Sequence, residues 1–198
     1  MRTLIVPILL FVSASSALAA DHAAVARASL IEIIRPGYAA FAEHAGGLEA
    51  KLAALCDTPS EAALKSVRGT FAATTGAWSK VEIFRFGPVI EDHRYERIFF
   101  WPHPKEGLGL KQLRRALPKK GQALTIPEEL DAKSVALQGL PSLEYLLYGD
   151  GAEALAETKS ATPGGQMPKI PSDAEFRCDF AVAVATNVHR IAKNRVEE

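Results

Sequence analysis

The stretch Leu137-Gln-Gly-Leu-Pro-Ser-Leu-Glu-Tyr-Leu-Leu-Tyr-Gly149 carries the most informative pattern in the chain. Its leucines recur at the spacing of one helix face, namely Leu140, Leu143 and Leu147, which predicts a helix packed against a core. Glu144 lies beside that face, one turn before Tyr148. A carboxylate in such apolar surroundings faces a groove, pairs with a cation or binds a ligand. The stretch therefore predicts a packed helix with Glu144 as a candidate functional residue.

Pro141 predicts a kink or a new helix start within this stretch. It lacks the backbone donor for the carbonyl of Leu137, and its ring clashes with that turn. At the first position of a new helix, proline is well tolerated. Glu144 would then lie near the first turn, where the helix dipole stabilises a carboxylate. Two interpretations stay open: an acid that stabilises a helix start, paired with an arginine, or an acid that binds a ligand.

Helical periodicity extends over most of the chain. Apolar residues recur at helical spacing in the segments 23–55, 60–86 and 128–148, in a short segment at 108–117, and from residue 172 onward. Pro36-Gly37 predicts a kink in the first segment, and Thr58 or Ser60 is the expected N-cap of the second. Strand patterns are weak throughout. The sequence therefore predicts an all-α, up-and-down helical bundle with kinked helices.

The first 20 residues are typical of a secretory signal peptide. Arg2 precedes an apolar run from Leu4 to Val12, and Ala17-Leu18-Ala19 fits a small-residue cleavage site. The apolar run is shorter than the roughly 20 residues that a transmembrane helix needs, and no later segment is long and apolar enough to span a membrane. We therefore expect a signal peptide over residues 1–20, a single helical domain over residues 21–198, and a periplasmic location without a membrane span.

The charge balance bears on the class of partner, and the cysteine content bears on the presence of a disulfide. The chain holds 23 basic and 23 acidic residues, so it offers no general attraction to nucleic acid. Its two cysteines, Cys56 and Cys178, suggest one disulfide in an exported protein. Two free buried thiols are the alternative.

A second candidate site follows from the segment 60–86. If the helix runs to Phe86, then Trp78, Glu82 and Arg85 lie on one stripe. One interpretation is an ion pair between Glu82 and Arg85 that orders the bundle. The other is a polar groove in which both residues face Glu144, with Trp78, Trp101 and Tyr148 around it.

Four blocks of the sequence resemble the imelysin-like family. They are Gly76-Ala-Trp-Ser-Lys-Val-Glu-Ile-Phe-Arg-Phe-Gly-Pro88, Arg97-Ile-Phe-Phe-Trp-Pro102, Gln138-Gly-Leu-Pro-Ser-Leu-Glu-Tyr-Leu-Leu-Tyr-Gly149 and Arg177-Cys-Asp-Phe-Ala181. The resemblance implies an exported helical protein, here the first of two related bundles. It also implies an association with bacterial iron uptake. Some members of the family carry a peptidase label that rests on a Gly-x-His-x-x-Glu motif proposed to bind metal.

This sequence departs from that motif at one position. Aligned on Gly139 and Glu144, the motif's histidine is replaced by Pro141. The resemblance carries Glu144 over as a metal residue, for iron or another divalent metal, but it supplies no histidine partner. A catalytic zinc site needs three protein ligands. We therefore expect no catalytic residue here. The loss of the motif's histidine also weakens the case for metal binding and for hydrolysis.

The sequence favours a non-enzymatic periplasmic binding or accessory protein linked to iron or haem acquisition. Its ligand-binding residues would be Glu144, Glu82, Arg85, Trp78 and Tyr148. Its partners would be a metal or small ligand and a periplasmic or outer-membrane iron-uptake protein. A metal-dependent peptidase or hydrolase is one alternative, and a helical structural or interaction module is the other.

Overall fold

A computed structural model describes residues 21–100, 107–157 and 172–194, and within these ranges the chain is helical without any strand. The predicted all-α class is confirmed. The principal α-helices are α1 (His22–Ser29), α2 (Arg35–Asp57), α3 (Glu61–Ser79), α4 (Arg94–Ile98), α5 (Leu108–Ala116), α6 (Pro127–Leu130), α7 (Gly139–Tyr148) and α8 (Asp173–Lys193). A π-helical turn, η1 (Leu30–Ile34), joins α1 to α2. Short 3-10 helices are η2 (Gly87–His93), η3 (Leu117–Lys119), η4 (Gln122–Leu124), η5 (Val135–Leu137) and η6 (Ala152–Ala156).

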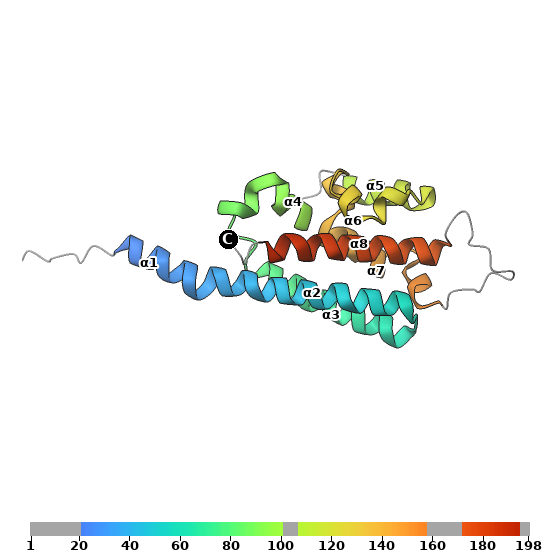
Figure 1. The fold of residues 1–198 in the computed structure, drawn as a ribbon, viewed down its shortest axis with the longest axis horizontal. Helices are drawn as coiled ribbons and strands as arrows, with labels where there is room; N and C mark the ends of the chain where they lie inside the picture. The colour runs from blue at the N-terminus through green and yellow to red at the C-terminus, as the bar shows by residue number, and fades with distance from the viewer. Residues whose placement is uncertain (1–20, 101–106, 158–171, 195–198) are drawn as a thin grey trace, which may run out of the picture.

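Three long helices form the body of the molecule. Helix α2 packs against both α3 and α8, and α7 packs against α8. Figure 1 shows α2 and α8 running side by side in opposite directions, with the short helices α4, α5 and α6 along the other side of α8. Each long helix contributes one buried stripe to a shared core. In α3 this stripe consists of apolar residues at helical spacing and includes Leu64, Val67, Phe71 and Trp78.

The first predicted helix is continuous through its expected kink. The π-helical turn of η1 comes just before Pro36 and leads directly into α2. Proline cannot donate to the carbonyl four residues earlier, and its ring crowds that turn. A widened π turn accommodates this defect without breaking the helix. Ile33, one of the regularly spaced apolar residues of this segment, is nevertheless 56% exposed.

Helix α2 also passes unbroken through Gly46-Gly47, and close packing against α8 explains the first of these glycines. A Cβ atom at Gly46 would lie 3.0 Å from Nε2 of His189. On the same seam, Nδ1 of His189 lies 2.6 Å from Oε2 of Glu49, and the Thr186 hydroxyl donates to Oε1 of Glu49 at 2.7 Å. Gly46 therefore makes room for a polar contact between the two helices.

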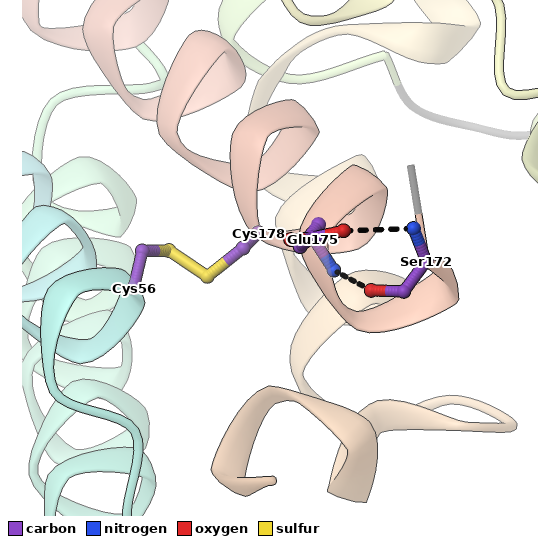
Figure 2. Close-up of a disulfide and its surroundings, with 4 residues drawn as sticks. All are labelled: Cys56, Ser172, Glu175 and Cys178. Atoms are coloured by element: carbon purple, nitrogen blue, oxygen red, sulfur yellow. Dashed lines mark hydrogen bonds between the residues drawn. A yellow bond between two sulfur atoms is a disulfide. The ribbon is translucent and has the colours of Figure 1, made fainter. Parts of the chain in front are cut away.

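A disulfide joins the C-terminal end of α2 to the second turn of α8. Cys56 and Cys178 are bridged with their Cα atoms 5.7 Å apart (Figure 2), so the predicted pairing is confirmed. Beside it, Ser172 caps α8. The Ser172 hydroxyl accepts from the Glu175 amide at 3.1 Å, and the Glu175 carboxylate accepts from the Ser172 amide at 2.9 Å.

The predicted helix over 128–148 is wrong in its first half. Helix α6 ends at Leu130, and a turn and η5 precede α7, which starts at Gly139. The new helix start that Pro141 predicted is therefore present, two residues earlier than the proline itself. Within the described ranges, no helix combines the length and apolarity needed to cross a membrane. The proposed signal peptide over residues 1–20 lies outside the described residues, as does Trp101.

Candidate functional site

A groove between α5 and α7 contains two of the predicted site residues. Its volume is about 390 Å³, within the range of small-molecule pockets. Its walls are mostly apolar, and it is lined by Gly107, Gly109, Leu110, Leu113, Ala136, Pro141, Glu144, Tyr145, Tyr148 and Gly149. Two of the five predicted ligand-binding residues, Glu144 and Tyr148, are thus brought together.

The helical period of α7 places Glu144 in this groove. The leucines on one face of the helix are at most 1% exposed and face the core: Leu140, Leu143 and Leu147. Pro141, Glu144 and Tyr148 follow at i, i+3 and i+7 and line the groove. Glu144 lies in the second turn of α7, and it has no hydrogen bond or ion pair among the residues that the structure describes. Its pairing with an arginine, one of the two sequence interpretations, is therefore absent within those residues.

Arg68 of α3 fixes the end of α7 next to the groove. Its Nε donates to the carbonyl of Leu147 at 2.8 Å, and its guanidinium carbon lies 5.1 Å from the centre of the Tyr148 ring. The Tyr148 hydroxyl donates back to the carbonyl of Arg68 at 3.1 Å. These contacts hold the Tyr148 ring in position even though it is 50% exposed.

Arg177 of α8 satisfies the carbonyls at the same end of α7. Its Nη2 donates to the carbonyl of Asp150 at 2.6 Å, and its Nη1 donates to that of Leu146 at 3.3 Å. Burial lowers the pKa of Arg177, and the nearby Tyr145 and Asp173 oppose that shift. The carbonyls at the end of a helix lack partners within it, so this buried arginine stabilises the wall that carries Glu144. Arg177 begins the block 177–181, one of the four that resemble the imelysin-like family, and its role in this block is to hold the end of α7.

The predicted stripe of Trp78, Glu82 and Arg85 is wrong beyond Ser79. Helix α3 ends at Ser79 and the chain continues in turns, in which bonds to the third residue back appear, as in Lys80 N to Ala77 O at 3.3 Å and Val81 N to Trp78 O at 2.9 Å. No ion pair joins Glu82 to Arg85 in the described part of the chain. None of the three residues lines the groove between α5 and α7. The single groove expected from the sequence is therefore not formed by these residues, and their ligand-binding role stays a prediction.

Tyr95 of α4 brings Trp78 and Arg85 together in another way. Its ring centre lies 5.4 Å from that of Trp78, and the Arg85 guanidinium carbon lies 4.1 Å from it. Nη2 of Arg85 donates to the Tyr95 hydroxyl at 2.5 Å. Burial raises the pKa of Tyr95, while Arg85 opposes this rise and Glu82 adds to it. Trp78 is 2% exposed, so it serves the core at this position.

A buried polar network beneath the start of α7 was missed from the sequence. Arg97 of α4 donates to the carboxylate of Asp131, to Oε1 of Gln138 at 3.2 Å and to Oδ1 of Asn187 at 3.0 Å. Asn187 donates to the same Gln138 oxygen at 2.7 Å, and Arg190 contacts both Asp131 and Asn187. Asn187 is fully buried. A polar residue on the apolar stripe of the last helix was the available sequence signal.

Gly139 lets α7 approach α4 closely above this network. Its φ is +77°, and a Cβ atom there would lie 2.3 Å from the carbonyl oxygen of Ile98 and 2.6 Å from that of Arg97. Left-handed backbone costs other L-residues roughly 1–2 kcal/mol. Because the clash involves backbone atoms, relief requires α4 and α7 to separate. Glycine is therefore required at the start of the helix that carries the candidate site.

We expect Gly139→Ala to lower the free energy of unfolding by about 3 kcal/mol, since strain and lost packing add together. Urea denaturation followed by circular dichroism measures this change. Gly47→Ala is the matched control, because nothing lies within 4 Å of a Cβ atom there. That control should be stabilising by about 0.5–1 kcal/mol. Equal effects of the two changes would contradict the close approach at Gly139.

The donor set of the groove does not fit a bare metal ion. Glu144 is the one acidic residue among the lining residues, and Pro141 occupies the position of the motif's histidine. In the described ranges, no group of three or more His, Cys, Asp or Glu side chains is placed to hold a metal. A protein site for a transition metal normally supplies three or four such ligands. One carboxylate is too few ligands to hold a catalytic metal ion in this groove.

Comparisons with known proteins agree with the fold and with the matched blocks. The model of the imelysin family matches residues 34–194. The structure is similar to the crystal structure of an imelysin-like protein from Psychrobacter arcticum 273-4, with a TM-score of 0.67 and 19% sequence identity. The similarity covers 88% of this chain and 48% of that one, so this chain spans about half the length of that relative. A search of curated proteins gives no match. The family model covers most of the chain and includes all four blocks quoted above, and the chain therefore belongs to the imelysin family.

Proposed function

We propose that this protein is exported to the periplasm and acts there as a non-enzymatic binding or accessory protein in iron or haem acquisition. Its ligand site is the groove between α5 and α7. The observation that carries this proposal is that Pro141 and Glu144, at the positions of the motif's histidine and glutamate, line one largely apolar groove. The link to iron rests on the family resemblance.

Export is supported by two independent features. The first 20 residues have the pattern of a signal peptide. The chain also forms a disulfide between Cys56 and Cys178, and such bonds persist in oxidising compartments such as the periplasm. A near-neutral formal charge gives no reason to expect a nucleic-acid partner.

Binding without hydrolysis is supported by the chemistry at Pro141. Histidine and glutamate three residues apart on a helix can share a metal ion, whereas proline has no donor to offer. Metal-dependent hydrolysis also needs an activated water on a metal held by several ligands. The groove supplies one carboxylate and no histidine among its lining residues.

The same donor set indicates the class of ligand. One carboxylate on apolar and aromatic walls suits an organic molecule better than a hydrated ion, because bare ions require several oxygen or nitrogen donors. Iron already coordinated by an organic molecule, as in haem or an iron chelate, needs few ligands from the protein. Leu110, Leu113 and Tyr148 would then contact the organic part, while Glu144 faces its polar edge or the iron.

Titration of the purified protein tests this proposal. We expect haem or a ferric chelate to bind, seen as a shift in the ligand's visible absorption. Zinc and ferrous ions alone should show no tight binding by calorimetry. Glu144→Ala should weaken ligand binding about tenfold, the effect of losing one charged contact. Glu128→Ala is the matched control, since Glu128 is exposed and lies outside the groove.

Three outcomes would overturn the proposal in different ways. Ligand binding that is unchanged in Glu144→Ala would place the site elsewhere. No binding of any iron compound would favour a structural or interaction module. Peptidase activity that chelators abolish would favour the hydrolase. The variant Pro141→His tests the hydrolase alternative directly, because it restores the histidine of the motif. It should create measurable zinc affinity that the wild-type protein lacks.

A further inference from the structure

An ion pair links the two walls of the groove at one of its ends. Arg114 belongs to α5 and lies one turn after Leu110, which lines the groove. Asp150 directly follows Gly149, which lines the groove where α7 ends. Nη2 of Arg114 lies 3.6 Å from Oδ2 of Asp150. The pair therefore stands at the rim of the cavity that holds the candidate site.

This ion pair is weak enough to exchange partners. The side chains of Arg114 and Asp150 are 57% and 86% exposed, and exposed ion pairs contribute little to stability. Their separation of 3.6 Å is also longer than a hydrogen bond. The backbone beneath the pair is firmly held, since the carbonyl of Asp150 accepts from Nη2 of the buried Arg177 at 2.6 Å. Asp150 thus has a fixed position and a carboxylate that a stronger partner of Arg114 can replace.

The wall formed by α5 belongs to a strongly basic segment. Residues 107–126 contain no acid and five basic residues, namely Lys111, Arg114, Arg115, Lys119 and Lys120. Because the whole chain is formally neutral, its remaining residues carry five more acids than bases. Clustered charge of one sign beside a cleft attracts ligands of the opposite sign. The groove therefore draws anions toward α5, although the chain as a whole has no net charge.

Glu144 and Arg114 place opposite charges at separate positions along the groove. Glu144 precedes Tyr148, at the end of α7, by four residues, or about 6 Å along the helix axis. It has no hydrogen bond or ion pair within the described ranges, whereas Arg114 stands beyond that helix end, beside Asp150. Like charges repel and opposite charges attract. A ligand that fills the groove is therefore favoured if its anionic group lies at the Arg114 end and its cationic or polar part near Glu144.

We propose that the groove takes an iron complex whose organic part carries a carboxylate, and that Arg114 binds this carboxylate in exchange for Asp150. The inference rests on the proposed function and adds to it the charge of the ligand and the residue that recognises it. A guanidinium binds a carboxylate through two parallel hydrogen bonds, which its contact with Asp150 does not provide. Asp150 keeps Arg114 at the rim and competes with the ligand for it.

Absorption titrations with haem, with its dimethyl ester and with ferric citrate test this proposal. Haem and the ester share the iron and the apolar body, but only haem has free carboxylates. We expect haem to bind the wild-type protein about tenfold more tightly than the ester does. Arg114→Gln should remove most of this difference by weakening haem binding alone. Of haem and ferric citrate, the tighter ligand identifies the source of the carboxylate, and its binding should depend on Arg114.

Asp150→Asn tests the exchange itself. We expect it to strengthen haem binding about two- to threefold, because the competing carboxylate is lost. The variant keeps the backbone carbonyl that Arg177 binds, so the wall of the groove should stay in place. Haem affinity that does not rise in Asp150→Asn would overturn the exchange.

Arg115→Gln is the matched control for Arg114→Gln. It removes the same charge from the same helix, but Arg115 is exposed and lies about 100° further around α5. It should change haem affinity less than twofold. Equal losses in the two variants would overturn the proposal, since the general charge of α5 would then explain binding. Equal affinity for haem and the ester, with binding that Glu144→Ala still weakens, would overturn it and leave the proposed function standing. No binding of any of the three probes would overturn both.

Discussion

A chain in which Cys56 and Cys178 are both replaced by serine should have a free energy of unfolding about 4–5 kcal/mol below that of the oxidised protein. The two cysteines are separated by 122 residues, and closing a loop of that length removes much of the entropy of the unfolded chain. The chain-entropy relation gives about 5 kcal/mol for such a loop. The free energy of unfolding of a small domain is only about 5–15 kcal/mol. We therefore expect the double serine variant to be close to unfolding at about 37 °C.

Urea denaturation of the two proteins measures this difference, and two controls isolate its cause. Wild-type protein unfolded without reductant should show no free thiol, and wild-type protein in excess reductant should match the double serine variant. If the reduced protein were as stable as the oxidised one, the disulfide would not stabilise the fold by reducing the conformational entropy of the unfolded chain. Adding reductant to the double variant should change nothing.

Asp131→Ala should lower the free energy of unfolding by about 3 kcal/mol. Asp131 is the carboxylate that both Arg97 and Arg190 contact. Its removal leaves two guanidinium groups close together, and the Arg97 side chain is only 15% exposed. Breaking a buried ion pair costs about 3–5 kcal/mol; the lower end applies because Asp131 is itself 29% exposed.

The control for this prediction is Asp150, which also pairs with an arginine but is much more exposed than Asp131. Asp150 pairs with Arg114 at 3.6 Å, and its side chain is 86% exposed. Asp150→Ala should change stability by less than about 1 kcal/mol. Adding Arg97→Met to Asp131→Ala should recover part of the loss, because one unpaired charge is removed. Additive effects of these two changes would show that the residues do not interact.

The helical class and the core followed from local patterns in the sequence. The stripe of Leu64, Val67, Phe71 and Trp78 is buried as its spacing predicts, because a helix repeats every 3.6 residues wherever it occurs. The caps at Ser60 and Ser172 are also local, since each side chain bonds to an amide three residues away. Such features need no knowledge of the rest of the fold.

The predicted site was only partly correct because it extended one local pattern too far. Periodicity alone did not reveal that α3 ends at Ser79, so it placed Glu82 and Arg85 on a helix face with Trp78. Tyr95, which brings Trp78 and Arg85 together, comes from α4. Contacts between residues that are distant in the sequence depend on how helices pack, and no spacing rule encodes them.

By itself, the sequence determined the helical class, the family resemblance and the importance of the segment 137–149, and it suggested the disulfide that the structure shows. The tertiary structure alone decided what surrounds Glu144. It showed that α5 forms the facing wall, that Arg68 and Arg177 hold the end of α7, and that Gly139 brings α7 against α4. The physical reason is the separation along the sequence over which each interaction acts. Helix formation and capping act within a few residues, whereas a groove is made by surfaces that only the packing of distant helices brings together.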